Sequence, residues 1–547
     1  MPVSYADLVV RDTRVVTWDG SRPSADAIAV RGDRVVALGA ADVAAVTGPR
    51  TAVLDGALVL PGFQDAHVHA PFAGHNLLRV WLNDLDGKDA YLAHIAAYAA
   101  AHPEAPWIVG GGWAMEHFPG GTPRKEDLDA VVPDRPVFLL NRDVHGAWVN
   151  SRALELAGID RATADPVDGR IERDPATGEP TGTLHEGAAY TFNDRFVPRP
   201  AQSDWEQAIR VAQRHLHALG ITGWQDAWVT PDTQAAYEAL AKNGELTARV
   251  VGALWWDRHR GLEQVDELVA RRGGGAVGSF WPTTVKIMAD GVMENYTGAL
   301  LEPYCDGCGG HTDNRGLTYV ERALLAEAVT ALDGHGFQVH MHAIGDRAAR
   351  DCLDAVAAAR AAHGPNDLRH HIAHLQLVQP EDLPRFAELG VVANCQAYWA
   401  QSDAQMDELT LPFLGAERAR LQFPFADLVR HGARLAMGSD WAVSTADPLA
   451  QIEVAVTRTD PSDRGGTPFL PHQALDVTTA FRAFTAGSAY VNHDDDAGVL
   501  RVGSRADLAV LDTDVLPVPG ATRALDVLPT DARVTATVAA GRVVHTA

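Results

Sequence analysis

Three His-x-His pairs are the residues of this sequence whose type and spacing could do chemistry. They are His67/His69, His215/His217 and His340/His342. Two imidazoles two residues apart on a β-strand point to the same face, so one such pair can hold one metal ion. His67 and His69 end the apolar run VLPGFQDAHVHA, and we expect them to bind metal. His215/His217 falls inside an amphipathic helix pattern, where positions i and i+2 do not face each other, and is expected to be structural.

Further candidate ligands end other strand-like segments. In FQVHMHAIGD both histidines alternate inward, and His342 lies nearer the end of the segment, so it is the expected ligand and His340 a neighbouring core group. His374 ends LRHHIAHLQ, and Asp440 ends ARLAMGSD. Nitrogen and carboxylate ligands together suit Zn, Mn or Fe better than Ca or Mg. The pattern predicts a divalent metal site, with zinc favoured.

A lysine and two cysteines allow other interpretations. Lys286, in PTTVKIMADG, alternates toward the same interior, and a buried lysine is costly unless it is paired or modified. From chemistry alone, a salt bridge to Asp290 is the preferred explanation. Cys305 and Cys308 form a single C-x-x-C without a partner pair, so we expect a loop with free thiols rather than a zinc site.

The elements that must position these residues follow a repeated pattern. Four times, an amphipathic helix pattern stops at glycine and an apolar strand pattern follows, over residues 205–227, 323–346, 381–399 and 425–440. This order predicts a parallel α/β protein. No G-x-G-x-x-G motif follows an early strand, so we favour a (β/α)8 TIM-like barrel, whose active sites lie at the carboxyl ends of the strands, over a doubly wound sheet.

The two ends of the chain differ from the middle. Both read as short strands, so residues 1–60 and 491–547 are predicted to form one composite β-sandwich beside the barrel of residues 61–490. Residues from about 74 to 200 are rich in Gly, Pro and Trp and break the repeat. They predict a lid inserted over the catalytic face.

Composition excludes several classes of protein. The 547 residues are 46% hydrophobic with a net charge of -25, which is typical of a globular protein. The absence of a basic block argues against nucleic acid or an anionic membrane as a partner. The start of the sequence lacks a basic stretch followed by an apolar core, and no apolar stretch reaches about 18 residues, so we expect neither a signal peptide nor a membrane span. Four cysteines do not make a disulfide framework, so we expect a cytoplasmic location.

Several segments together carry a family resemblance. They include PGFQDAHVH, GGGWAME, VKIMADGVMENYTGALLEPY, HMHAIGDRA, IAHLQ and AMGSDWAV. In their order and spacing the sequence resembles the amidohydrolase superfamily, and within it amidohydrolase family 3, which includes N-substituted formamide deformylases. The resemblance runs nearly end to end. After IAHLQ the sequence departs from it, since NCQAYWAQSD has Ala397 where members often have proline followed closely by histidine.

The resemblance implies roles for the candidate residues. His67 and His69 would bind one metal, and His342 and His374 a second. Lys286 could be carboxylated, as N6-carboxylysine, to bridge the two metals. An unmodified lysine would leave a single-metal site. Asp440 would be the proton shuttle as well as a member of the ligand set.

These roles predict a metal-dependent hydrolase that cleaves the C–N bond of a small, non-peptide amide or formamide. A metal would lower the pKa of a bound water and polarise the substrate carbonyl. His145 could also polarise the carbonyl. Trp113, Tyr296 and Trp399 are candidates for the pocket wall, which favours an apolar or aromatic N-acyl substrate, although packing roles are equally open.

Two alternative functions stay open. An ester, lactone or carbamate hydrolase could use the same site, and a scaffold without metal could retain the fold. The presence of every expected ligand type disfavours the scaffold. The expected partner is a small-molecule substrate, and a homodimer is the expectation that the family resemblance gives.

Overall fold

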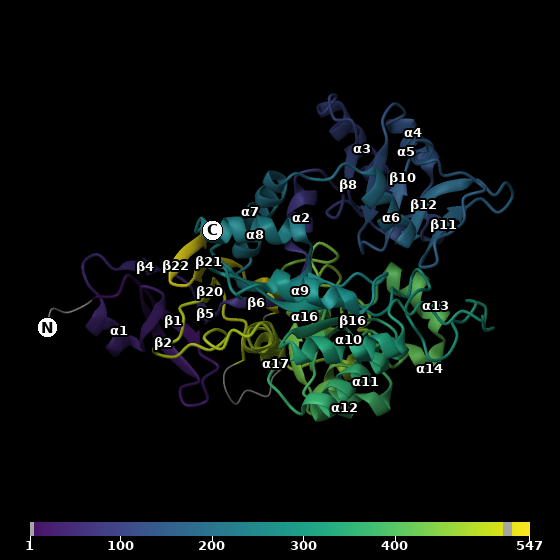
Figure 1. Ribbon diagram of the computed structural model, residues 1–547. Coiled ribbons are helices and arrows are strands. Elements are labelled where there is room, and N and C mark those ends of the chain that lie inside the picture. The colour runs from purple at the N-terminus through teal and green to yellow at the C-terminus, as the bar shows by residue number, and fades with distance from the viewer. Residues whose placement is uncertain (1–4, 518–527) are drawn as a thin grey trace.

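The computed structural model describes residues 5–517 and 528–547, so both ends of the predicted terminal domain lie partly outside the described residues. Three units are visible in Figure 1: a sheet with strands from both ends of the chain, a central barrel, and a domain inserted into the barrel. The chain leaves the barrel after the first barrel strand, forms the inserted domain, and returns to the barrel before the second strand.

Eight parallel strands form the barrel, and neighbours in chain order are hydrogen-bonded neighbours in space. The strands are β6 (Phe63–Val68), β13 (Ile221–Val229), β14 (Arg249–Trp255), β15 (Phe280–Met288), β16 (Gln338–Ala343), β17 (His371–His374), β18 (Val392–Cys395) and β19 (Arg434–Met437). At the seam, Asp440 N donates to His67 O at 2.7 Å, and His69 N donates to Trp441 O at 2.8 Å. The predicted barrel is therefore confirmed, nearly closed by contacts between its first and last strands.

The predicted helix–glycine–strand units are present around the barrel. The helices before β13, β16, β18 and β19 are α7 (Gln202–Ala218), α10 (Arg322–Gly334), α12 (Leu383–Leu389) and α15 (Phe425–Arg430). The others on the barrel include α8 (Pro231–Lys242), α9 (Val265–Arg272), α11 (Asp346–His363), α16 (Pro448–Thr457) and α17 (Val477–Arg482). Within the described parts of the chain, no helix is both long and apolar enough to cross a membrane.

Strand alternation divides the barrel into an apolar outer layer and a polar interior. Val285, Ile287, Val339 and Met341 are fully buried in the core shared with the helices. The residues between them carry polar side chains that are almost as deeply buried, including Lys286, His340 and His342. A barrel interior filled with polar groups is costly unless each finds a partner. The groups that bond to these buried polar side chains therefore outline the candidate site.

Strands from both ends of the chain are neighbours in one eight-stranded sheet. The order is β22-β21-β20-β5-β1-β2-β3, with β4 beside β1. Their bounds are β1 (Leu8–Val16), β2 (Ser24–Arg31), β3 (Arg34–Leu38), β4 (Ala52–Leu54), β5 (Leu58–Pro61), β20 (Leu508–Leu511), β21 (Val534–Ala539) and β22 (Arg542–Thr546). The antiparallel pair β5–β20 joins the two ends, and a shared apolar cluster includes Val10, Val59 and Val510.

The inserted domain occupies the region predicted to be a lid and has its own sheet. Its strand order is β11-β12-β10-β9-β8-β7. The strands are β7 (Val80–Trp81), β8 (Ile108–Trp113), β9 (Val137–Asn141), β10 (Gly146–Val149), β11 (Gly169–Arg173) and β12 (Pro180–Glu186). Helices α3 (Lys88–Ala101), α4 (Lys125–Val131), α5 (Ser151–Ala157) and α6 (Gly187–Phe196) pack with them.

Trp113 lies in the core of this inserted domain, which is the packing role that the sequence left open beside a place in the pocket wall. Its side chain is 1% exposed. Its indole Nε1 donates to Leu139 O at 2.9 Å, and its ring lies 5.6 Å from Phe118 and 6.3 Å from Trp148. Since β8 is an interior strand of the sheet, its last side chain is covered by these neighbours.

Candidate metal centre

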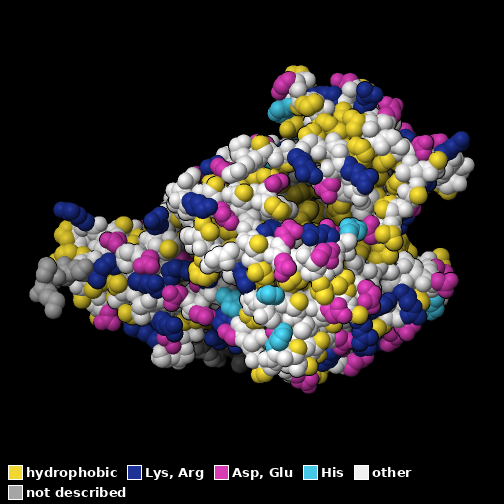
Figure 2. All heavy atoms as spheres, viewed as in Figure 1, with side chains coloured by type: hydrophobic (Ala, Val, Ile, Leu, Met, Phe, Trp, Pro, Cys, Tyr) yellow, Lys and Arg dark blue, Asp and Glu magenta, His cyan; other side chains and the backbone are white. Residues whose placement is uncertain are grey.

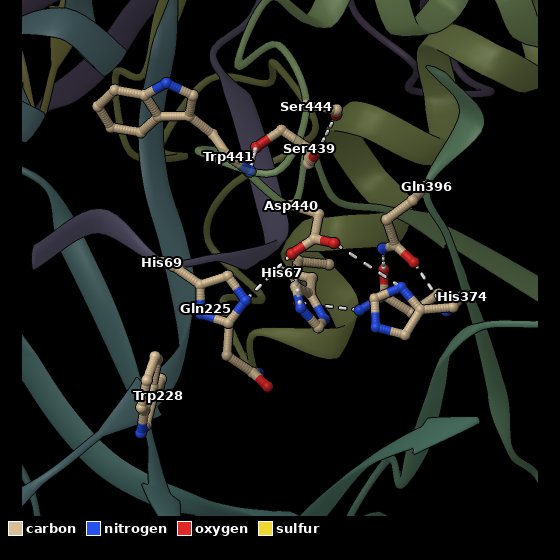
Figure 3. Close-up of polar contacts among 12 residues, drawn as sticks. His67, His69, Gln225, Trp228, His374, Gln396, Ser439, Asp440, Trp441 and Ser444 are labelled. Carbon is tan, nitrogen blue, oxygen red and sulfur yellow. Dashed lines mark hydrogen bonds and ion pairs between the residues drawn. The ribbon is translucent and has the colours of Figure 1, made fainter. Parts of the chain in front are cut away.

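The predicted ligands lie at the carboxyl ends of the barrel strands, or just beyond them. His67 and His69 come from the end of β6, and Asp440 follows β19. Lys286, His342 and His374 come from β15, β16 and β17. Figure 3 shows His67 and His69, from the end of β6, and His374, from β17, directed toward Asp440. Within the described part of the chain, the group of side chains arranged to hold a metal is His67, His374 and Asp440, whose ligand atoms lie within 4.8 Å of one another.

Asp440 is at the centre of this arrangement. Its Oδ1 lies 3.2 Å from His67 Nε2 and 3.1 Å from His69 Nε2, and its Oδ2 lies 3.9 Å from His374 Nδ1. All four side chains are buried or nearly so. Nevertheless, among the described residues, Asp440 Oδ1, His69 Nδ1 and His374 Nδ1 make no hydrogen bond. Buried polar atoms without partners mark a place where another group belongs.

A buried hydrogen-bond network sets the proton positions on His67. Gln338 Nε2 donates to two backbone carbonyls, those of Arg369 and Val491, so Gln338 Oε1 must accept, and Gln225 Nε2 donates to it at 3.0 Å. Gln225 Oε1 therefore faces His340 and accepts from His340 Nδ1 at 2.7 Å. The backbone carbonyls thus fix the direction of every bond in the network.

This direction leaves a lone pair on His67 at the site. His340 is protonated on Nδ1, so its Nε2 accepts from His67 Nδ1 at 2.8 Å. Burial, and then the charges of Lys286 or His371, hold the pKa of both imidazoles well below 6.5, so each carries one proton. His67 Nε2 and Asp440 Oδ1 are therefore two acceptors facing each other at 3.2 Å. A cation between them would relieve the repulsion, and the donor set fits a divalent metal.

The backbone at the site is held in an unusual conformation. His374 and Asp440 have φ of 78° and 56°, in the left-handed region that non-glycine residues seldom adopt. Such strain costs about 1–3 kcal/mol per residue and persists where the surroundings impose it. Gln396 Oε1 accepts from His374 N at 2.7 Å, and the Trp399 ring stacks on the His374 ring with centroids 5.0 Å apart. The segment that departs from the family pattern thus supports a candidate ligand directly.

Asp65 joins the first and last strands below the site. Its carboxylate accepts from Ser439 Oγ at 2.5 Å and from the backbone N of Ser439 and His67 at 3.0 Å each. A Cβ atom on Gly438 would lie 2.5 Å from His67 N, so only glycine fits beside the ligand strand. These contacts fix His67 relative to Asp440.

Asp290 holds His342 and does not pair with Lys286. Its carboxylate accepts from His342 Nδ1 at 3.1 Å and from the backbone N of Ala299, Ile344 and Gly345. The salt bridge that chemistry alone preferred for Lys286 is therefore wrong, because backbone amides and His342 occupy the oxygens of Asp290. His342 Nε2 is left to face His374, whose ring lies 4.5 Å away.

Lys286 is 1% exposed in the barrel interior. Burial lowers its pKa to about 7, although the charge of Asp440 acts in the opposite direction. A substantial share of this amine is consequently uncharged near neutral pH. An uncharged amine is the form that can react with carbon dioxide.

The inserted domain contributes His145, which forms an ion pair with Glu186. His145 Nδ1 lies 2.8 Å from Glu186 Oε2, and its ring lies 5.8 Å from the His342 ring. Burial opposes both charges, but their mutual attraction outweighs it, raising the pKa of His145 to about 9 and lowering that of Glu186 to about 2. Thr297 of the barrel donates to Glu186 at 2.7 Å, so the pair is anchored to both domains.

Other sequence candidates take structural places. Tyr296 packs between Tyr304 and Phe413, with ring centroids 5.7 and 5.0 Å away, and does not line the two cavities described below. His217 bonds to Ile221 O and Thr247 Oγ1, as expected for a structural histidine. Its partner His215 stacks on Trp441 at 4.5 Å. Cys305 and Cys308 are free thiols.

Sequence reasoning missed the residues that hold the ligands. They are Asp65, Glu186, Gln225, Asp290, Gln338 and Gln396. Asp65 and Gln225 each belong to a Gln-Asp pair inside a predicted strand, in GFQDAHVHA and ITGWQDAWV, which is a signal that could have singled them out. The other four give no comparable local signal.

Comparison with known proteins agrees with the fold and identifies the family. The family model described as amidohydrolase family matches residues 53–545. The chain is 28% identical to N-substituted formamide deformylase of Arthrobacter pascens, covering 96% of this chain and 97% of that one. It is 31% identical to the protein LONG AFTER FAR-RED 3 of Arabidopsis thaliana, over 93% and 88% of the two chains. An uncharacterised metal-dependent hydrolase of Pyrococcus furiosus matches in structure with a TM-score of 0.70 at 25% identity, covering 93% and 99%.

These matches define a barrel hydrolase of the metal-dependent type. The chain belongs to the amidohydrolase family. The family membership predicted from the sequence is confirmed, while the roles of the individual site residues stay predictions.

Proposed function

We propose that this protein is a metal-dependent amidohydrolase that cleaves the C–N bond of a small, non-peptide amide with an apolar or aromatic N-acyl group. The observation that carries the proposal is the cluster of His67, His69, His374 and Asp440, which is buried at the strand ends and contains polar atoms without a hydrogen-bond partner among the described residues. The similarity to a formamide deformylase over nearly the whole chain supports a C–N bond as the target. Zinc is the favoured metal, with manganese or iron as alternatives.

The metal's contribution, when bound, would be a water of lowered pKa and a polarised carbonyl. In this proposal His67 and His69 hold one ion, and His342 and His374 hold a second. A carboxylated Lys286 would bridge the two ions. Carboxylation would also remove the cost of a buried ammonium, since the product carries oxygen ligands in place of the positive charge.

Two further residues would handle the substrate and its protons. Asp440 lies within 3.2 Å of two imidazoles and in this role takes the proton of the attacking water and returns it to the leaving nitrogen. His145 carries a proton at neutral pH and stands on the inserted domain beside His342, where its ring can donate to the carbonyl oxygen as negative charge develops. A cytoplasmic location, a small-molecule partner and a homodimer complete the proposal.

The test is hydrolysis of N-acyl amines, matched esters, lactones and carbamates by the purified protein, before and after chelation and after zinc is restored. His67→Ala should abolish turnover, whereas His431→Ala, a substitution of an exposed histidine, should not. Amide cleavage that zinc restores supports the proposal. Cleavage of esters, lactones or carbamates alone would replace the C–N assignment with the alternative hydrolase. A folded, zinc-loaded protein that cleaves none of them would leave the scaffold as the better account.

A further inference from the structure

Two separate cavities flank the candidate metal centre. Cavity A lies between the barrel and the inserted domain, and its volume is about 340 Å³. Its wall includes His69 itself and, around it, Phe72, Val109, Phe138 and Trp228. The Trp228 ring lies 6.2 Å from the His69 ring, and Figure 3 shows it beside that histidine. In Figure 2 a hollow lined largely by hydrophobic side chains opens between the inserted domain and the barrel.

Cavity B has a different wall and also a volume of about 340 Å³. Its wall includes the residues that follow two candidate ligands, Ile344 after His342 and Trp441 after Asp440. Trp399, which stacks on the His374 ring, is part of the same wall. Cavity A is therefore bordered by the candidate ligand His69, and cavity B by side chains that stack on or directly follow other candidate ligands.

One helix contributes to both walls. Helix α2 (Ala70–Leu77) begins directly after His69. Its residues Phe72, His75 and Asn76 line cavity A, whereas Leu77 at its end lines cavity B. Helix α2 therefore borders both cavities, directly after the candidate ligand His69.

We infer that the substrate has two apolar arms, with the acyl group and the amine in different cavities. This inference rests on the proposed function and narrows it: the acyl group is larger than formyl and of about ring size, because a formyl group would leave one cavity without an occupant. Volumes near 300 Å³ are those of small-molecule sites lined by apolar and aromatic groups. Besides its apolar side chains, cavity B carries four carboxylates and one guanidinium, namely Asp84, Asp143, Glu294, Asp403 and Arg142. Arg142 is paired with Glu116 at 3.3 Å, so the excess of acids disfavours an anionic arm such as that of an N-acyl amino acid.

The test narrows one cavity at a time. Val109→Trp narrows cavity A and Leu77→Trp narrows cavity B, and both positions are only partly buried, so the larger ring does not have to enter a closed core. Leu156→Trp, on the exposed face of α5, is the matched control. N-benzylbenzamide carries both arms, N-benzylformamide lacks the acyl ring, and N-methylbenzamide lacks the amine ring.

In the wild type, each ring should raise kcat/KM by at least about tenfold over the substrate that lacks it, as a well-fitted apolar group does. Val109→Trp should remove the gain for one ring and Leu77→Trp the gain for the other, while Leu156→Trp keeps both. The inference would be overturned if both cavity variants lost the kcat/KM gain for the same ring, or if both variants kept the gains for both rings.

A binding measurement separates this inference from the proposed function. The affinity of the chelated, metal-free protein for the three amides is measured by calorimetry, where no turnover occurs. If Val109→Trp weakens binding of one ring and Leu77→Trp weakens binding of the other, but no amide is cleaved after zinc is restored, the two cavities are supported and the hydrolase is refuted. If the amides are cleaved but the two variants do not differ in which ring they bind less tightly, the hydrolase is supported and the two-cavity inference is refuted.

Discussion

Replacing Gln225 with leucine removes the acceptor that orients two buried histidines without opening a large cavity. His340 Nδ1 and His371 Nε2 lie 2.7 and 2.9 Å from Gln225 Oε1, and both N–H groups would lose their partner. Gln338 Oε1 keeps the hydroxyl of Thr284 at 2.7 Å. Two unpaired buried donors cost about 1–3 kcal/mol each, so the fold should lose about 2–6 kcal/mol.

The same substitution should weaken metal binding. Without Gln225, His340 can carry its proton on Nε2 and donate to His67 Nδ1, which places the proton of His67 on the nitrogen that faces Asp440. Loss of such supporting contacts typically lowers metal affinity about 10–100-fold. Competition with a chromophoric chelator measures the affinity, and thermal melting of the metal-free protein measures the stability.

A matched control separates the two effects. Gln234 is also buried, and it bonds to Arg271 on the outside of the barrel, so Gln234→Leu should lower the melting temperature without changing metal affinity. If Gln225→Leu melts earlier but binds zinc as tightly as the wild type, the network does not set the proton of His67. If neither property changes, the network itself is refuted.

Three further predictions concern single residues. Activity should fall as pH rises through about 9, where His145 loses its proton. Glu186→Gln should move this fall to lower pH, because it removes the negative charge that raises the pKa of His145. Identical pH–activity profiles for the wild type and Glu186→Gln would contradict the role of the pair. Lys286 should show a carbamate carbonyl signal in ¹³C NMR with labelled bicarbonate, absent in Lys286→Met, and no difference between the two would argue for an unmodified lysine. Gly438→Ala should lower both melting temperature and zinc affinity, since the new Cβ would meet His67 N at 2.5 Å, and wild-type values would show that the seam can relax.

The barrel could be predicted because its signal is local. Helix patterns that stop at glycine and lead into strands, such as α7 into β13, repeat along the chain, and alternation within β16 places His340 and His342 on the inner face. Chain-end strands likewise indicated a shared terminal unit. These features depend on residues close together in sequence.

The supporting contacts could not be predicted because they join distant strands. Gln225 reaches His340 across 115 positions, and Asn295 reaches His145 across 150. The choice between a pocket wall and core packing stayed open for Trp113 for a related reason: only the inserted sheet, which the sequence around Trp113 does not reveal, buries it against Trp148. Tertiary partners decide burial at such positions, and the sequence around them does not show which partners these are.

Metal content tests the central claim most directly. Protein purified without added metal is measured by elemental analysis beside His67→Ala and His431→Ala, with folding of each checked by circular dichroism. The account predicts about one to two equivalents of zinc, manganese or iron in the wild type and in His431→Ala, and a clear loss in His67→Ala. A wild-type protein that is folded but takes up no metal, even when zinc is supplied, would contradict it.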